Sequence, residues 1–400
     1  MHHIFTELRE LLHEGPSQAS WEKLCTLVER PQCPSTAIDY AQHHLVQWDN
    51  KETDEPWGNM PSHWLTDLPL KAKPLALVRT IHLSMDDFRL DAQHMLVPPL
   101  HRLAHLDLPY IHTLTLDTMF LSDPSWRALS RAPWLSNLAE VGLNCSYITD
   151  HSDAPLSLPV SFRGHVPWGE LLSNVTSPTR LNFERCLGLS ELETLMEQVS
   201  LERLEHLEIR SSSLGDHGLE VLLQAELPSL RVLKLQNVEL TPYAARLLAH
   251  ASHLNNLDTL VLSQNGLADE GLQVLSQAQH LSSLRFLCMC HNGITPQGLE
   301  KLIHSPVMCA LQGLDLSWNT LGDAGALLLS QAPYLDDLDA LYMFSNNVQS
   351  GGYDALKQRW PHLKDDLERQ VERDASPWPW GHPQTNVTYD SEGNPIYRRC

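Results

Sequence analysis

The sequence has few positive charges for its length and no cluster of them. Its 400 residues include 28 lysines and arginines against 49 aspartates and glutamates, so the formal net charge is −21. Nucleic acids are bound largely through phosphate neutralisation by clustered lysine and arginine, and we therefore expect no nucleic-acid partner. An acidic surface favours a basic protein partner instead, although acidic excess also serves simply to keep a protein soluble.

Long apolar runs are also missing. The N-terminal residues 1–9 contain no extended hydrophobic stretch, and no segment is long enough to span a membrane, so we expect neither a secretory signal nor a membrane anchor. The eight cysteines are scattered and never form a C-x-x-C pair. This spacing favours a reducing compartment and predicts a cytoplasmic protein.

Motifs of catalysis are absent: the sequence contains no G-x-S-x-G, no P-loop and no G-x-G-x-x-G. His101 and His105 have the spacing of two metal ligands on one helix turn, but the glutamate of H-E-x-x-H and a third ligand are missing. Cys288 and Cys290 would lie on one face of a strand, next to His291, and small apolar surface residues explain them better than redox chemistry. We therefore expect no catalytic residues, no cofactor and no metal.

A leucine pattern recurs ten times between Val78 and Val348. The four clearest copies follow one another and begin at Leu257, Leu284, Leu311 and Leu338. They follow the form L-x-x-L-x-L-x-x-N-x-L, with Met289, Ile294, Met343 and Val348 in place of leucine in the second and fourth copies. Six weaker copies begin near Val78, Ile111, Leu138, Pro178, Leu204 and Leu230. Consecutive intervals of 26 or 27 residues with apolar residues at fixed offsets indicate a repeat protein.

Each copy predicts the same local structure. The L-x-x-L-x-L segment is a short strand whose alternate residues point inward. Helical spacing of apolar residues follows at 271–281, 298–308 and 325–335. Asp216, Asp269 and Asp323 stand where helix N-caps are expected, and Thr241-Pro242 and Thr295-Pro296 give a cap residue followed by proline.

This consensus resembles that of the leucine-rich repeat proteins, and one strand with one helix per 27 residues resembles their ribonuclease-inhibitor-like class. The resemblance implies an α/β solenoid, a horseshoe with a parallel sheet on the concave face and helices on the convex face. It also implies a structural ladder of asparagine side chains between coils, formed by Asn265, Asn292, Asn319 and Asn346. The loose Gln- and His-rich repeats suggest a bacterial source.

Four segments follow from the repeat boundaries. Residues 1–74 form a helical N-terminal cap and a connector, and residues 75–350 form a solenoid of about ten coils. Residues 351–374 form a C-terminal capping helix, which Pro361 splits, and residues 375–400 form a tail containing Trp and Tyr, with a possible hairpin. A longer interval at Thr149–Thr179 predicts a loop in place of a convex helix.

The residues between the inward leucines should face the concave side and carry the function. The middle of the sheet is charged, with Arg185, Glu208 and Arg210, and its C-terminal end offers Phe286, His291, Asp315, Trp318, Tyr342 and Phe344. Large aromatic side chains on an exposed sheet face are typical of a binding surface, although the aromatic tail is an equally good candidate to cover them.

The sequence thus predicts a monomeric, non-enzymatic scaffold that binds a protein through its concave face. Two alternatives remain open. One is a regulator of a GTPase or another enzyme, in the way that the GTPase activator of Ran acts. The other is an enzyme centred on Cys288, Cys290 and His291.

Overall fold

The computed structural model describes residues 2–49, 58–62, 65, 77–88, 94–96, 99–118, 120–144, 147–149, 155–157, 164–165, 168–375, 388–389 and 395–396. The chain divides into two compact units. Unit 1 comprises residues 1–178 and 387–400, and unit 2 comprises residues 179–386.

Ten short strands form an open parallel sheet whose order follows the order of the chain. Each strand begins two residues after the start of one predicted copy of the leucine pattern, which confirms the repeat and the solenoid. The strands are β1 (Thr80–Ser84), β3 (Thr113–Asp117), β5 (Glu140–Asn144), β9 (Arg180–Glu184), β10 (His206–Arg210), β11 (Val232–Gln236), β12 (Thr259–Val261), β13 (Phe286–Cys288), β14 (Gly313–Asp315) and β15 (Ala340–Tyr342).

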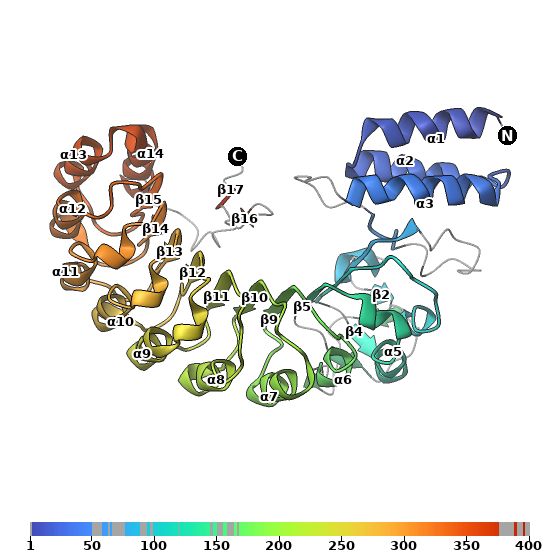
Figure 1. Cartoon of the computed structure of the whole chain (residues 1–400), viewed down its shortest axis with the longest axis horizontal. Helices are drawn as coiled ribbons and strands as arrows, with labels where there is room; N and C mark the ends of the chain where they lie inside the picture. Colours follow the sequence, from blue (N-terminus) through green and yellow to red (C-terminus); the bar gives the residue numbers. More distant parts are fainter. Residues whose placement is uncertain are drawn as a thin grey trace. The chain divides into compact units, whose positions relative to one another are not determined.

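Within unit 2, β9 to β15 line the inner side and the helices lie on the outer side (Figure 1). Leu260, Leu287 and Leu314 are register partners in adjacent strands and are fully buried between these two layers. The outer elements are α7 (Leu189–Gln198), α8 (Gly215–Leu222), α9 (Pro242–His250), η6 (Ser252–Leu254), α10 (Ala268–Leu275), η7 (Gln279–Leu281), η8 (Pro296–Gly298), α11 (Leu299–Leu302), η9 (Pro306–Met308), α12 (Gly322–Ser330) and α13 (Ser350–Arg359). The helices are shorter than the apolar spacing predicts, because each coil ends in a separate turn before its next strand.

Asparagine side chains connect each coil of unit 2 to the one before it. The Asn319 amide donates to the carbonyl of Met289 in the preceding coil (3.0 Å) and to that of Leu316 in its own coil (2.8 Å). Its carbonyl oxygen accepts from the backbone N–H groups of Asn292 (3.0 Å) and Ile294 (2.9 Å). Asn265, Asn292 and Asn346 make equivalent bonds. One buried amide therefore satisfies backbone groups of two coils where both leave the sheet.

In eight of the ten coils the residue before the asparagine position adopts a left-handed backbone conformation. Its φ lies between 49° and 58° in Thr118, Arg185, Ser211, Asn237, Gln264, His291, Trp318 and Ser345. In this conformation the amide of Gln264 still donates to Cys290 O (2.8 Å) and that of Trp318 to Phe344 O (2.7 Å), so the ladder between coils continues past the strand. The conformation is costly for residues other than glycine, and the inter-coil bonds hold it in place.

The prediction that Asp216, Asp269 and Asp323 cap their own helices is wrong. Each is the second residue of its helix, and the caps are the preceding leucines. Their carboxylates instead accept from the amide of the N-cap residue in the next coil, which is Thr241 (2.9 Å), Thr295 (2.7 Å) or Gln349 (2.7 Å). Thr241 and Thr295 are the helix N-caps, as predicted. The aspartates therefore bridge helices of neighbouring coils, and only in every second coil.

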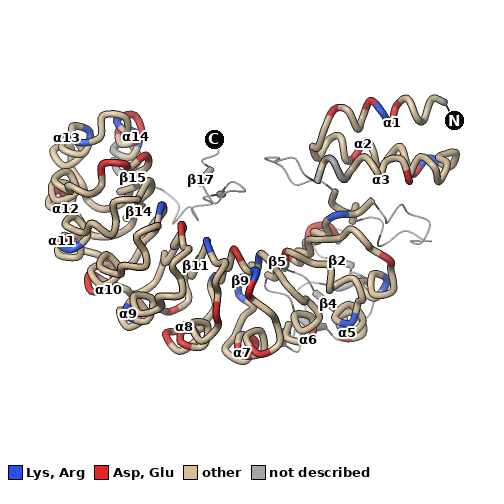
Figure 2. Tube along the Cα trace, in the orientation of Figure 1, with Lys and Arg blue, Asp and Glu red and all other residues tan. Residues whose placement is uncertain are grey.

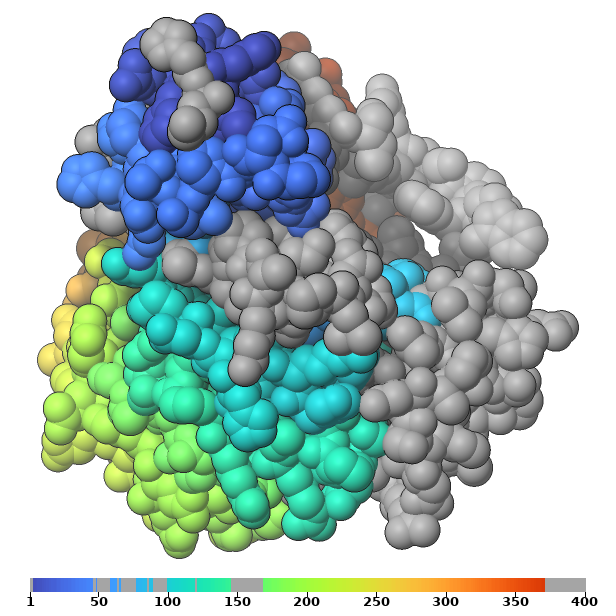
Figure 3. Space-filling view, turned by 90° about the vertical axis from the view of Figure 1, so that its right-hand side faces the viewer, coloured from blue at the N-terminus to red at the C-terminus, as the bar shows by residue number. Residues whose placement is uncertain are grey.

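Unit 1 begins with three helices, α1 (His2–Glu14), α2 (Gln18–Val28) and α3 (Ser35–Asp49), whose side chains gather into one continuous body (Figure 3). Residues 58–60 run along the outer edge of β1. Gly58 O accepts from Thr80 N (3.2 Å), Met60 N donates to Thr80 O (2.9 Å) and the Asn59 side chain accepts from His82 N (2.8 Å). Trp21 of α2 donates to Asn59 O at 2.6 Å, which ties the helices to that edge.

The insertion at Thr149–Thr179 contains ordered elements and is more than the predicted loop. Here β7 (Pro155–Ser157) pairs antiparallel with β2 (His94–Leu96), and β8 (Gly164–His165) joins β6 (Tyr147–Thr149), which pairs with β4 (Phe120–Ser122). The sequence of the insertion has many prolines and glycines but no alternation long enough to show such short strands. The other elements of unit 1 are η3 (Met85–Phe88), η4 (Leu100–Arg102), α5 (Asp123–Leu129), η5 (Pro133–Asn137) and α6 (Gly169–Leu172).

The free edge of the last strand, β15, is hydrogen-bonded by a glutamine side chain. After α13 come η10 (Pro361–Leu363) and α14 (Lys364–Ala375), so the break at Pro361 is where the sequence places it. Gln370 of α14 is 1% exposed. It accepts from Met343 N at 2.7 Å and donates to Leu341 O at 2.8 Å, which are backbone groups that another coil would otherwise bind. Most of the tail lies outside the described residues, but β16 (Thr388–Tyr389) and β17 (Pro395–Ile396) pair antiparallel.

Replacing Asn319 should show what one rung of the asparagine ladder contributes. Asn319→Ala leaves buried backbone groups of two coils unpaired, and we expect the free energy of unfolding to fall by about 3 kcal/mol. Urea denaturation followed by circular dichroism measures this change. Asn255→Ala, at an exposed turn position, is the matched control and should change stability little. Equal effects of the two substitutions would contradict the role given to Asn319.

The role of Gln370 can be tested in the same way. Gln370→Ala removes both bonds to the edge of β15, and we expect a loss of about 2 kcal/mol of stability together with faster hydrogen exchange at the Met343 amide. Gln358→Ala, on the exposed face of α13, is the control. Unchanged exchange at Met343 in Gln370→Ala would show that the edge is protected by something else.

Candidate functional site

The residues of the unit 2 sheet that point away from the helices form its inner wall, and they fall into two chemically different zones. The charged zone lies on β9 to β11 and consists of Arg180, Glu184, Arg185, His206, Glu208, Arg210 and Lys234. The aromatic zone lies on β13 to β15 and the turns after them, and consists of Phe286, Cys288, Cys290, His291, Asp315, Trp318, Tyr342 and Phe344. Between them β12 presents Thr259 and Val261, which carry no charge.

Glu208 is the centre of the charged zone. Its side chain is 11% exposed, and three groups surround its carboxylate. Lys234 Nζ lies 3.4 Å from Oε2, His206 Nε2 lies 3.3 Å from the same oxygen, and Arg210 Nε donates to Oε1. The three strands β9, β10 and β11 pair in register around this residue. The structure thus joins Glu208 and Arg210, two residues that the sequence analysis selected, in one ion cluster.

The surroundings of Glu208 keep it ionised. Burial alone would raise the pKa of the carboxyl group, but the hydrogen bond from His206 and the positive charges of Lys234 and Arg210 outweigh burial and hold the pKa well below its ordinary value of 4.5. For Lys234 the balance is different, because burial lowers the pKa of the ammonium group and the carboxylate of Glu208 offsets only part of that effect. Each of these two buried charges is stabilised by the other.

His206 is held neutral in a definite tautomer. Arg180 Nη1 lies 3.4 Å from Nδ1, and a guanidinium can only donate, so Nδ1 must accept. Nε2 then carries the proton and donates to Glu208. Burial lowers the pKa of the imidazole, and the hydrogen bond to Glu208 only partly opposes it. The sequence analysis did not select His206, because nothing in the sequence shows that the first residue of β10 turns toward Glu208.

The rim of the charged zone is more accessible than its centre. The side chains of Arg185 and Arg210 are 53% and 41% exposed, and that of Glu184 is 32% exposed. Both guanidinium groups approach Glu184, Arg185 at 3.9 Å and Arg210 at 4.0 Å. The backbone N–H of Arg185 donates to Arg210 O (2.9 Å), so the two arginines lie at the same end of adjacent strands.

In the aromatic zone, Phe286 is not the exposed residue that the sequence predicts. It is 7% exposed and covers Gly313 of the next strand, where an added Cβ would lie 2.4 Å from the phenylalanine ring. Glycine at this position makes the room that the ring occupies. Tyr342 and Phe344 stack with ring centroids 6.2 Å apart and planes inclined by 13°, and both are half-buried, as is Trp318. His291 is exposed.

Cys288 and Cys290 are also buried, which corrects their predicted place on an exposed surface. They are 4% and 8% exposed, and Cys288 Sγ donates to Asp315 Oδ2 at 3.6 Å. Burial first, and then the charge of Asp315, raise the pKa of both thiols. Burial likewise raises the pKa of Asp315, whose carboxylate accepts from Ser317 N at 2.9 Å. Thiols held protonated in this way are poor nucleophiles.

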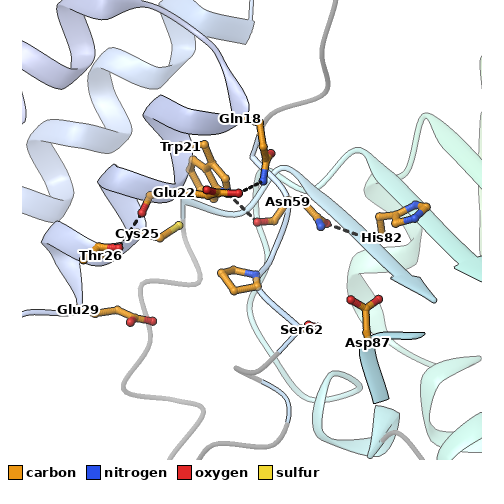
Figure 4. Close-up of a pocket in the computed structure, with 11 residues that line it drawn as sticks. Gln18, Trp21, Glu22, Cys25, Thr26, Glu29, Asn59, Ser62, His82 and Asp87 are labelled. Atoms are coloured by element: carbon orange, nitrogen blue, oxygen red, sulfur yellow. Dashed lines mark hydrogen bonds between the residues drawn. The ribbon is translucent and has the colours of Figure 1, made fainter. Parts of the chain in front are cut away.

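Unit 1 contains a hollow that the sequence analysis did not foresee, because it depends on how residues 59–62 fold against α2. The cavity measures about 420 Å³ and lies between α2, this segment and the region of β1 and η3 (Figure 4). Burial, followed by the charges of Glu29 and Glu22, raises the pKa of Cys25 in its wall to about 12. The lining residues are Gln18, Trp21, Glu22, Cys25, Thr26, Glu29, Asn59, Pro61, Ser62, His82 and Asp87.

The structure also bears on the two histidines with metal-ligand spacing and on membrane-spanning segments. His101 lies in the short η4 and not in an α-helix, and its Nδ1 lies 3.2 Å from Ser125 Oγ. Among the described residues, no three His, Cys, Asp or Glu side chains are grouped as metal ligands would be. Within the same residues, every helix is too short or too polar to cross a bilayer.

The charged zone makes a prediction about stability. Lys234→Met leaves Glu208 buried without its ammonium partner, and we expect the free energy of unfolding at pH 7 to fall by about 3 kcal/mol. The double variant Lys234→Met, Glu208→Leu should recover most of that loss, because an apolar pair replaces a broken ionic one. Chemical denaturation of the three proteins measures both changes, and a double variant less stable than Lys234→Met would contradict the argument.

The same cluster sets a pH dependence. A carboxyl group whose pKa is lower in the folded protein contributes stability above its unfolded value, near 4.5, and that contribution is lost as the pH falls below it. We therefore expect the wild type to lose more stability than Glu208→Leu between pH 5 and pH 3. Denaturation curves over this range test it, and parallel curves for the two proteins would refute it.

Comparison with known proteins agrees with the repeat. The leucine-rich repeat family model matches residues 253–276 and 308–330. No curated protein matches the chain.

Solved structures similar to the chain have low sequence identity to it. Rad7 in its complex with Elc1 from yeast has 16% identity and a TM-score of 0.47, over 87% of this chain and 89% of that one. An internalin from Listeria monocytogenes has 14% identity and a TM-score of 0.38, over 73% and 86%. The C-terminal domain of tropomodulin from Caenorhabditis elegans has 16% identity and a TM-score of 0.30, over 40% and 99%. These likenesses are too weak to carry an argument. The sequential parallel strands and the buried leucines of the chain itself give it the fold of a leucine-rich repeat solenoid, and its function must be argued from its own residues.

Proposed function

We propose that the protein is a non-enzymatic scaffold that binds a protein partner on the inner wall of unit 2. The observation that carries the proposal is the combination of charged and aromatic zones on one continuous sheet face. Strands of one sheet lie about 4.8 Å apart, so the step from β10 to β14 covers about 19 Å. A surface of that length matches one side of an ordinary protein interface better than the site of a small molecule.

The left-handed residues support the same wall. Arg185, Gln264, His291 and Trp318 carry large side chains where glycine would relieve the backbone. Strain kept at several equivalent positions is typical of functional surfaces. In our proposal the binding residues are therefore Arg185, Glu208, Arg210, His291, Asp315, Trp318, Tyr342 and Phe344, and Phe286 packs over Gly313 on the same face of the sheet.

The finer features of the proposal rest on the sequence pattern. One strand with a short helix or turn per coil supports a ribonuclease-inhibitor-like class, and the scattered cysteines support a cytoplasmic location. A monomeric state is part of the proposal. Regulation of a GTPase is the second candidate, and it uses the same wall. The enzyme centred on Cys288 and Cys290 is disfavoured by the raised pKa of both thiols.

Site-specific photocrosslinking tests the proposed face. A photoreactive phenylalanine derivative is placed at Asn237 or Gln264, exposed residues on the rim of the inner wall. The matched control positions are Tyr243 and Leu327 on the outer helices, each 46% exposed. We expect the same crosslinked partner from both rim positions in native lysate and none from the outer positions.

The outcome that contradicts the proposal is a partner crosslinked from Tyr243 or Leu327 and not from the rim. Assaying GTP hydrolysis by the captured partner, with and without this protein, separates a passive scaffold from a regulator. A change in hydrolysis rate on addition of the protein would favour the regulator.

A further inference from the structure

Glu184 lies between two exposed guanidinium groups without forming a close ion pair with either. Its oxygens are 3.9 Å from Arg185 and 4.0 Å from Arg210, whereas paired guanidinium and carboxylate groups normally approach to about 2.8 Å. The two arginines come from adjacent coils. Arg210 is paired with Glu208 through Nε, but neither its terminal nitrogen nor that of Arg185 is within close ion-pair distance of Glu184.

The position of Arg185 is fixed by the backbone. Its φ of 56° places it in the left-handed row, and its N–H donates to Arg210 O. Gln264 occupies the equivalent position with the same φ, so the backbone accepts a neutral side chain there. The arginine is thus not required for the turn, and its charge needs another explanation.

The local charge differs in sign from that of the whole chain. The charged zone contains four cationic side chains, Arg180, Arg185, Arg210 and Lys234, against the carboxylates of Glu184 and Glu208; the Lys and Arg positions on β9 and β11 can be seen in Figure 2. Glu208 is buried and already surrounded by Lys234, His206 and Arg210. Since salt screens charges beyond about 8 Å in physiological solution, a ligand at this rim meets the arginines and not the net charge of −21.

We propose that Arg185 and Arg210 bind an acidic segment of the partner, whose carboxylate takes the place of Glu184 between them. Glu184 holds the two guanidinium groups in position while the site is empty and competes with the ligand for them. This inference rests on the proposed binding function of the inner wall and adds the chemistry of the partner, since guanidinium groups recognise carboxylates through paired, charge-assisted hydrogen bonds.

The test uses the full chain and a short fluorescent peptide of alternating glutamate and glycine, with a lysine and glycine peptide as its counterpart. Fluorescence anisotropy measures the dissociation constant. For the acidic peptide we expect Arg185→Gln to weaken binding about tenfold and Glu184→Gln to strengthen it about threefold. The controls are Arg246→Gln and Glu270→Gln, an exposed ion pair on the outer helices whose arginine is also 53% exposed, and they should change nothing.

The opposite sign of the two expected effects makes the inference falsifiable. Weaker binding of the acidic peptide to Glu184→Gln, no effect of Arg185→Gln, or preference of the wild type for the lysine peptide would each overturn it. Thermal unfolding of each variant confirms that the fold is intact. If the acidic peptide fails to bind while crosslinking from Gln264 persists, the inference falls and the binding function of the wall stands; loss of crosslinking at the rim would overturn the proposed function itself.

Discussion

The structure depends on the need of every coil to find hydrogen-bond partners for its backbone in its neighbours. The helical part of a coil pairs its own backbone groups, but its strand and the turn after it cannot, and buried groups left unpaired cost about 1–3 kcal/mol each. Strand pairing satisfies them along the sheet, and the left-handed residue with the asparagine after it satisfies them where the chain turns away. At the two ends of the sheet, residues 58–60 and Gln370 replace the missing neighbour.

This requirement concerns the backbone, so the strand residues on the inner wall are free to vary. The leucines of β12 to β15 alternate with residues as different as Val261, Cys288, Asp315 and Tyr342 without disturbing the register. Even a buried ion cluster is tolerated on β10, because its carboxylate has three donors around it. The fold therefore restricts the buried leucines between sheet and helices strongly and the residues on the exposed face of the sheet much less. A binding specificity can therefore develop on that exposed face.

The sequence predicts much of the fold and less of the site. The leucine spacing gives all ten strands to within two residues, and the break at Pro361 is placed correctly, because both follow from short-range patterns. Phe286 and the two cysteines are misjudged, because their burial depends on Gly313 and Asp315 of the next strand, which lie 27 residues away in the chain. The aspartates near the helix starts are misjudged for the same reason. His206 is missed because its tautomer and partners exist only once three coils are stacked.

The bridging aspartates give the solenoid a longer period than its leucines do. Asp216, Asp269 and Asp323 each reach forward to the helix start of the next coil, where Gly298 and Gly352 leave room for the last two of these carboxylates. Coils that offer the carboxylate therefore alternate with coils that receive it. These bridges therefore repeat every two coils. Shortening or extending this half of the protein by two coils would preserve every such bridge, whereas changing it by a single coil would place two carboxylate-offering or two carboxylate-receiving coils next to each other.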